Sequence, residues 1–304
     1  MKIVYFGTPA IAAQILEYLC ENGVEVLAIV TKVDKPRGRS GKPAFSPVKA
    51  LALKNYPDTP LYQPERASTK EFEEELKKFD ADLFVVFAYG EIIKQNLLDL
   101  PCLGCINLHP SLLPKYRGPA PIRFALLDGV KETGVSVIEM TLKMDAGDIL
   151  AQEKIDVPQD KDYAWLEEAL MTLGEKMILD VIQNYEERFK KRTLQDPDGV
   201  TFVKKITPEM AEIDWNKSAT QIHNQIRAFS PKPGAWCKAS VNGKEKRIKI
   251  LNSTVSNEGP CYEKGKWVIG CREGAISVLR LQLEGKKALN IEEFMKGFQK
   301  APIL

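Results

Sequence analysis

The sequence lacks long apolar runs. No window approaches the ~18 uninterrupted apolar residues that indicate a membrane span. Residues 1–7 also lack the apolar core and cleavage site of a signal peptide, and they are not an arginine-rich transit segment. We therefore expect a cytoplasmic protein that does not contact a membrane.

The six cysteines form no disulfide framework, which fits reduced thiols in a cytosol. Cys102 and Cys105 make one Cys-x-x-Cys pair, but a zinc site needs four ligands, usually from two such pairs or from a pair and histidines. Cys261 and Cys271 are ten residues apart, and His223 is distant in sequence. We expect no metal, and thiols buried beside a strand.

A Gly-x-Gly-x-x-Gly fingerprint is also missing. The first apolar run, residues 3–6, is followed only by Gly7, Thr8 and Pro9. Dinucleotide-binding sheets place a glycine-rich turn at this point so that a pyrophosphate can approach the backbone. Its absence disfavours a nicotinamide- or flavin-dependent oxidoreductase.

The chain has little excess of either charge, since its net charge is only +2. The charged residues are nevertheless unevenly distributed along the sequence. Residues 205–304 contain 17 lysines and arginines against 10 aspartates and glutamates, a net charge of +7, and the preceding residues carry −5. A basic C-terminal part favours a polyanionic partner. A lysine-rich surface that binds nothing would give the same excess.

Apolar runs alternate with helical patterns through the first two-thirds of the chain. The runs are residues 3–6, 24–30, 61–62 and 82–88, and the helical patterns are 9–21, 46–54 and 69–79. This alternation predicts an α/β fold with a mostly parallel, Rossmann-like sheet covered on both faces. Residues 133–140 and 148–157 alternate in polarity and predict an antiparallel addition, and 162–189 predict one or two helices.

The last third of the chain predicts a different architecture. Short strand patterns follow one another with glycine turns, among them Asn242-Gly243, and indicate a small C-terminal OB-like β-barrel. Polar residues 190–205 precede it and read as a linker. We therefore expect an N-terminal domain over 1–189, a linker over 190–205 and a C-terminal domain over 206–304.

His109, one of only two histidines, follows Asn107 at strand spacing. On an extended strand, residues i and i+2 point to the same side, so both side chains would face one reacting group. Histidine exchanges protons near neutral pH. The segment also lies where an open parallel sheet binds ligands, at a strand's carboxyl end. A core histidine and a turn asparagine would give the same spacing.

Asp145 follows 36 residues later in a glycine-bearing loop. An aspartate beside an imidazole orients it and stabilises its protonated form. Asn107, His109 and Asp145 would then supply an oxyanion donor, a proton carrier and its orienter. No serine or cysteine is clearly placed as a nucleophile, although Ser111 is near, which favours direct transfer between two bound substrates. A turn aspartate is the alternative for Asp145.

The motifs around these residues carry a family resemblance. They are Asn107-Leu108-His109-Pro110-Ser111-Leu112-Leu113-Pro114, Tyr116-Arg117-Gly118 and Met144-Asp145-Ala146-Gly147-Asp148. Others occur in order along the chain: Phe6-Gly7-Thr8-Pro9, Asp34-Lys35-Pro36-Arg37-Gly38-Arg39, Ser46-Pro47-Val48-Lys49, Tyr89-Gly90 and Ser230-Pro231-Lys232-Pro233-Gly234-Ala235-Trp236. Together they resemble the folate-dependent formyltransferases. One departure is Pro110, where some members carry glycine.

The resemblance implies transfer of a formyl group from 10-formyltetrahydrofolate to the α-amino group of methionine on initiator tRNA. Asn107, His109 and Asp145 match the catalytic triad of the family. The folate-contacting loop is matched by Ser111, Leu112, Leu113 and Pro114. We expect a monomer with folate and tRNA as its partners.

A basic loop, residues 34–49, fits the same picture. It contains one acid and the cations Lys35, Arg37, Arg39, Lys42 and Lys49. We expect it to contact tRNA phosphates, with Lys35, Arg37, Arg39 and Lys42 as the contacts. A solvated basic loop is the alternative.

Three other functions compete with this one. A formyltransferase for a small amine, such as an amino sugar nucleotide, would share the same catalytic residues and folate. The basic loop and the +7 C-terminal part argue against it. A nucleic-acid-binding protein without catalysis would not need Asn107, His109 and Asp145, and the missing glycine fingerprint disfavours an oxidoreductase.

Overall fold

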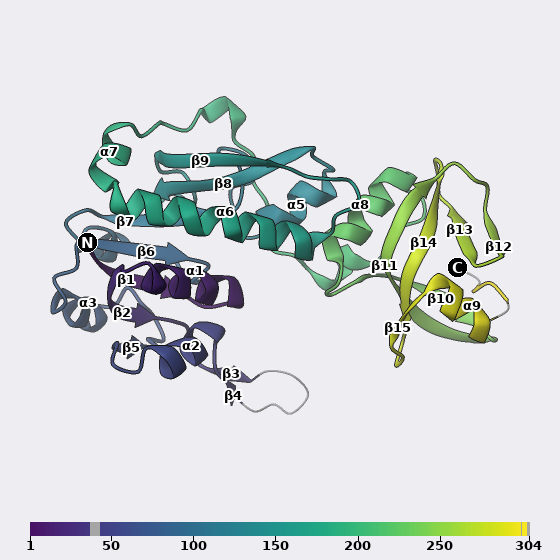
Figure 1. The fold of residues 1–304 in the computed structure, drawn as a ribbon, viewed down its shortest axis with the longest axis horizontal. Helices are drawn as coiled ribbons and strands as arrows, with labels where there is room; N and C mark the ends of the chain where they lie inside the picture. The colour runs from purple at the N-terminus through teal and green to yellow at the C-terminus, as the bar shows by residue number, and fades with distance from the viewer. Residues whose placement is uncertain (37–42, 299, 303–304) are drawn as a thin grey trace. The chain divides into compact units, whose positions relative to one another are not determined.

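A computed structural model of the chain describes residues 1–36, 43–298 and 300–302 (Figure 1). The predicted contacts Arg37, Arg39 and Lys42 lie outside the described residues. The chain divides into two compact units. Unit 1 contains residues 1–117, 134–154 and 170–202, and unit 2 contains 118–133, 155–169 and 203–304.

Unit 1 is built on a seven-stranded sheet with the order β5-β2-β1-β6-β7-β8-β9. The strands are β1 (Lys2–Gly7), β2 (Glu25–Val30), β5 (Leu61–Tyr62), β6 (Leu83–Phe87), β7 (Cys105–His109), β8 (Glu132–Glu139) and β9 (Ile149–Asp156). The pairs from β5 to β7 are parallel, and β8 runs antiparallel to β7. The carboxyl ends of β1, β2, β6 and β7 therefore meet at one edge, where such sheets bind ligands.

Helices cover both faces of this sheet. They are α1 (Ala10–Glu21), α2 (Pro47–Asn55), α3 (Lys70–Lys77), α4 (Gln95–Leu98), α6 (Tyr163–Gln183) and α7 (Tyr185–Lys190), with the first turns of α6 counted in unit 2. In Figure 1, α1 and α6 lie in front of the strands, and Gln14 donates to Glu175 between them at 2.8 Å. A Cβ at Gly174 would lie 3.0 Å from Leu108, so glycine allows α6 to approach β7 closely.

Alternate residues of the central strands are buried on opposite faces. Val4 and Phe6 of β1, with Phe84 of β6, pack against Phe72 of α3. On the other face, the buried Tyr5 hydroxyl donates to the Ala12 carbonyl oxygen of α1 at 2.7 Å. Burial on both faces explains why these strands are continuous apolar runs in the sequence.

Unit 2 is built on an antiparallel sheet with two packed helices, α5 (Pro121–Leu127) and α8 (Ala219–Phe229). The strands are β10 (Ala235–Val241), β11 (Lys244–Ser256), β12 (Cys261–Glu263), β13 (Lys266–Gly270), β14 (Ala275–Leu283) and β15 (Ala288–Asn290), and α9 (Ile291–Gly297) follows. Asn242 and Gly243 both have positive φ, 52° and 77°, as a tight hairpin between β10 and β11 requires.

The predicted fold class is confirmed: a mostly parallel Rossmann-like sheet precedes an antiparallel sheet. Within the described ranges no pairing joins β10 to β12, so the predicted barrel is an open path of strands. The domain boundaries at 189 and 206 stay a prediction. Residues 190–202, expected to be a linker, cluster with unit 1. Over residues 1–36, 43–298 and 300–302, no helix is long and apolar enough to cross a membrane.

We predict that Phe84→Ala lowers the free energy of unfolding by about 3–5 kcal/mol, because it leaves a cavity beside Phe6. Ile92→Ala, at a side chain 71% exposed, should change it by less than ~0.5 kcal/mol. Urea unfolding followed by circular dichroism at the helix band measures both. Equal effects would contradict the placement of Phe84 in the core.

Candidate active site

Strand β7 places Asn107 and His109 at the carboxyl edge of the sheet. Asn107 pairs with Val86 of β6 on one side and Ile138 of β8 on the other, and His109 is the last residue of the strand. The intervening Leu108 is buried, 1% exposed, against α6. Asn107 and His109 therefore project from one face, with Leu108 on the other.

The His109 imidazole is 4% exposed and has a polar group opposite each nitrogen. Its Nε2 donates to the carbonyl oxygen of Tyr116 at 3.0 Å. Its Nδ1 lies 3.7 Å from Oδ2 of Asp145, which is longer than a hydrogen bond. The carbonyl can only accept, so Nε2 carries a proton. A second proton would go to Nδ1, facing the Asp145 carboxylate.

Burial lowers the pKa of His109 below its ordinary value, because the charged ring loses its hydration. The Asp145 charge and the Tyr116 carbonyl oppose this effect and raise the pKa. The imidazole therefore takes up a proton with difficulty and depends on these two groups when it does. Such a group is suited to exchange a proton during a reaction.

Asp145 lies in the loop between β8 and β9 and has a positive φ of 50°. Two residues later, a Cβ at Gly147 would lie 1.9 Å from the Glu139 carbonyl oxygen. Only glycine fits this close approach, which turns the loop back over the sheet. The sequence Asp145-Ala146-Gly147 thus has a steric reason as well as a chemical one.

In the predicted folate loop, Ser111 and Leu113 are buried, and Leu112 and Pro114 are partly exposed. The Ser111 hydroxyl is fully buried and donates to the Lys115 carbonyl oxygen at 2.7 Å. Leu113 is 3% exposed, and Leu112 and Pro114 lie against the positions of Gly134 and Gly199. Any ligand contact by this loop must come from its backbone or from the partly exposed Leu112 and Pro114.

At the predicted basic loop, Lys35 is exposed in β3 (Lys35–Pro36), which pairs with β4 (Pro43–Ala44). Lys49, the last of the five cations in this loop, forms an ion pair with Asp34 at 2.6 Å. Its hydrogen bond lowers the pKa of the Asp34 carboxyl, and Gln63 adds to the effect. This pair fixes the base of the loop.

Sequence reasoning missed several residues that build the site. Ser136 of β8 donates to the Ser111 carbonyl oxygen at 2.7 Å and accepts from the Leu113 amide at 3.2 Å. Tyr116, with φ of 62°, aims its carbonyl at His109. The Tyr116-Arg117-Gly118 motif was the only signal, and it did not reveal this contact.

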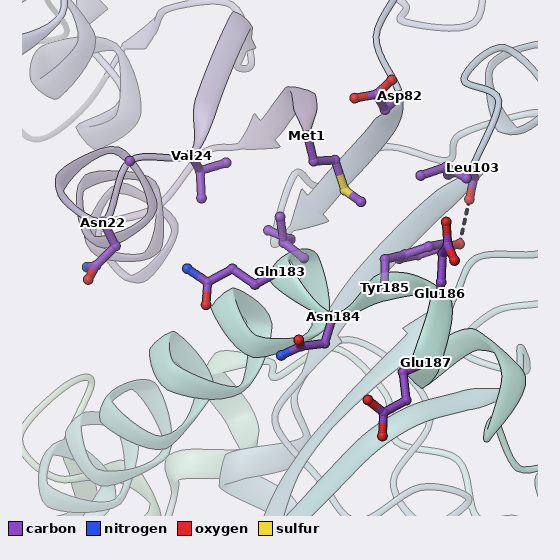
Figure 2. Close-up of a pocket in the computed structure, with 12 residues that line it drawn as sticks. Met1, Asn22, Val24, Asp82, Leu103, Gln183, Asn184, Tyr185, Glu186 and Glu187 are labelled. Carbon is purple, nitrogen blue, oxygen red and sulfur yellow. Dashed lines mark hydrogen bonds between the residues drawn. The ribbon is translucent and has the colours of Figure 1, made fainter.

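A hollow of about 740 Å³ lies elsewhere in unit 1, beside the residues that precede β1 and β6 (Figure 2). Asp82, Gln183 and Tyr185 are among its lining residues, and Tyr185 donates to the Leu103 carbonyl oxygen at 2.6 Å. It contains none of the predicted site residues. Among the described residues, no cluster of three His, Cys, Asp or Glu side chains is placed to hold a metal.

Comparisons with known proteins show the family to which the chain belongs. The model of the family described as "Formyl transferase" matches residues 1–182, and "Formyl transferase, C-terminal domain" matches residues 205–299. The chain therefore belongs to the formyl transferase family. Methionyl-tRNA formyltransferase of Protochlamydia amoebophila is 46% identical over 99% of this chain and 96% of its own length. Curated relatives of the same name from Chlamydia caviae and Caldanaerobacter subterraneus are 39% identical.

Solved structures share the fold at lower identity. The N-formyltransferase from Helicobacter canadensis, in complex with folinic acid and dTDP-3-aminofucose, aligns with a TM-score of 0.66 and 22% identity, covering 91% of this chain and 98% of its own. HypX from Aquifex aeolicus, in complex with tetrahydrofolic acid, aligns with a TM-score of 0.64 and 19% identity over 99% of this chain. The chain spans about half the length of HypX, 48%.

We predict that Asp145→Asn lowers the pKa of His109 by roughly one unit, because the imidazolium loses its facing charge. With only two histidines, the ¹⁵N-imidazole spectrum is simple, and His223→Asn assigns it. Asp148→Asn is the matched control, since that carboxylate faces Arg192 at 3.1 Å instead. If the pKa of His109 shifts in Asp148→Asn but not in Asp145→Asn, the pairing of His109 with Asp145 is refuted.

Proposed function

We propose that this formyl transferase moves the formyl group of 10-formyltetrahydrofolate onto the α-amino group of methionyl-tRNA, as its curated relatives' name implies. The observation that carries the chemistry is the buried His109 imidazole, held between the Tyr116 carbonyl and the Asp145 carboxylate, two residues from Asn107. The choice of methionyl-tRNA as the acceptor rests on the similarity to methionyl-tRNA formyltransferase over 99% of the chain.

Each of the three residues has a distinct role in this proposal. The amine adds to the formyl carbon, and the oxygen there gains negative charge. The side-chain amide of Asn107, which is partly exposed, donates to that oxygen. Protonated His109 adds a positive charge at the same edge. Asp145 stabilises this charge and helps to move a proton from the amine to the folate nitrogen. The bond between that nitrogen and the formyl carbon then breaks, the carbonyl forms again on the new amide, and tetrahydrofolate leaves.

The folate would bind at the carboxyl ends of β6 and β7. Gly90, which follows β6, has open space around its Cα and a φ of 84°. The neighbouring Tyr89 is buried, and its backbone carbonyl accepts from Thr8 at 2.9 Å, so the loops after β1 and β6 are fixed together. The partly exposed Leu112 and Pro114, in the loop that follows β7, would offer apolar contacts to it.

In unit 2, one face of the β10–β11 hairpin is suited to a polyanion. Lys238 pairs with Arg247, and Trp236 pairs with Lys249, so three cations and an aromatic ring share this face with Glu245. The Arg247 guanidinium lies 3.9 Å from the centre of the Trp236 ring. Cations next to an aromatic surface fit RNA phosphates and bases, which supports tRNA as the partner of unit 2.

A small-amine acceptor is the second hypothesis, and it is not favoured. Solved sugar formyltransferases share the fold at 21–22% identity, whereas the curated relatives with full-length matches act, by their name, on methionyl-tRNA. One assay separates the two: the protein with 10-formyltetrahydrofolate and either methionyl-tRNA or a dTDP-amino sugar. Formylation of the sugar alone would replace our proposal.

We expect Asn107→Ala and His109→Ala each to lower the rate of N-formylmethionyl-tRNA formation by about 100- to 1,000-fold, because each removes stabilisation of the developing negative charge. Circular dichroism should show an unchanged fold. Asn22→Ala, after the last turn of α1, should keep full activity. Rates like those of the unsubstituted protein from either site variant would rule out these roles.

The basic loop has its own test in the salt dependence of tRNA binding. Replacing Arg37 and Arg39 with glutamine should reduce the slope of log Kd against log salt by roughly 1.5, because two phosphate contacts are lost. The control replaces Lys77, the last residue of α3, and Lys78, which follows it, in the same way, because both pair with glutamates of that helix. An unchanged slope in the loop variant would remove this loop from the interface.

A further inference from the structure

Gln195 connects two loops of unit 1 through all the hydrogen-bonding capacity of its side chain. Its Nε2 donates to the carbonyl oxygens of Asp145, at 2.9 Å, and Gly147, at 2.7 Å. Its Oε1 accepts from Nε and Nη2 of Arg117, at 3.0 and 2.7 Å. A primary amide has two donors and two acceptor sites, so this side chain is fully used. A surface glutamine that merely fills space would not be bound in this way.

These two loops supply both partners of the His109 imidazole. Asp145 faces Nδ1, and Tyr116, which precedes Arg117, accepts from Nε2. Asp145 and Tyr116 both have positive φ, 50° and 62°. For residues other than glycine this conformation is unfavourable and persists only where the surroundings hold it. Gln195 bonds to the backbone of the loop that contains Asp145. In the other loop it bonds to Arg117, the residue next to Tyr116.

The segment that carries Gln195 is itself fixed on both sides. Thr193 exchanges two backbone hydrogen bonds with Ile149 of β9, at 2.8 and 2.9 Å. On the other side, the Thr201 carbonyl oxygen accepts from the Arg117 amide at 2.9 Å, and its Oγ1 accepts from the Tyr116 amide at 2.8 Å. Gln195 therefore projects from an anchored backbone and can hold the loops at a set separation.

We propose that Gln195 is a positioning residue, which fixes the Asp145 carboxylate and the Tyr116 carbonyl against the two nitrogens of His109. Its part in catalysis rests on the proposed formyl transfer, whereas its effect on His109 can be measured without turnover. Because the amide is neutral, it acts through geometry and adds no charge to the site. The catalytic contacts themselves belong to Asn107, His109 and Asp145.

The direction of the effect follows from the groups that face His109. Asp145 is the charged side chain opposite the ring among the residues described, and the Tyr116 carbonyl is the other polar partner. Both stabilise the imidazolium, in which each nitrogen carries a proton. If the loops separate, burial still opposes the charge while its two partners are weakened. The pKa of His109 therefore falls when Gln195 is lost.

The test is an NMR titration of the two histidines in Gln195→Leu, which has a similar volume but no polar group. We expect the pKa of His109 to fall by roughly 0.5–1 unit and that of His223 to stay unchanged. Gln183→Leu, an exposed glutamine on α6, is the matched control and should move neither. In an Asp145→Asn background, Gln195→Leu should have a smaller effect, because the two changes share one interaction.

Activity measurements separate positioning from a general structural role. We expect kcat to fall by up to about tenfold at neutral pH, with KM for methionyl-tRNA within about twofold, and the deficit to shrink as the pH is lowered and His109 is protonated again. Gln195→Asn keeps the amide on a shorter side chain and should give a weaker shift in the same direction. If Gln195→Leu does not fold, the same measurements are made on Gln195→Asn.

The outcomes are distinct. An unchanged or raised pKa of His109 in the folded Gln195 variants overturns the proposal. A loss of activity that comes with a lower melting temperature and a higher KM, and with no titration shift, also overturns it. If the titration shifts as expected but the unsubstituted protein forms no N-formylmethionyl-tRNA, the proposed function fails and the positioning of His109 by Gln195 stands.

Discussion

The site in unit 1 depends on the burial of one imidazole. A histidine that is 4% exposed needs a polar partner at each nitrogen, because water no longer supplies one. The chain provides these partners from two loops that are distant in sequence, and both do so at a residue in the left-handed region, Tyr116 and Asp145. The left-handed backbone at these two residues places both partners against the same imidazole.

Much of the scaffold could be predicted from the sequence because its signals are local. Residues 82–88 form a continuous apolar run, and this run is the buried strand β6. The helical pattern over 9–21 became α1, and Asn242-Gly243 made the hairpin turn. Each depends on periodicity or on turn chemistry within a few residues. The short strands β12 and β15 were not predicted, since three residues are too few to show a pattern.

The supports of the site could not be predicted in the same way. Gln195 reaches Asp145 across 50 residues and Arg117 across 78, and no local pattern marks such a contact. The polar composition of residues 190–205 suggested a linker, but it did not reveal that Gln195 and Thr201 bond to the loops of unit 1. Ser111 was assigned to a ligand by resemblance, but its hydroxyl is consumed inside the protein. The sequence motifs drew attention to this segment but did not reveal which way its side chains point.

Gly147 has a consequence for how freely this chain can vary. A Cβ there would lie 1.9 Å from the backbone oxygen of Glu139, and no rotamer or neighbouring side chain can relieve a clash between two main-chain segments. In a library that randomises residues 144–148, selection for soluble protein alone should therefore retain glycine at 147 while it accepts changes at the exposed Met144. Selection for soluble protein would then report the steric requirement at 147, and selection for activity would report the chemical requirements of the same five residues.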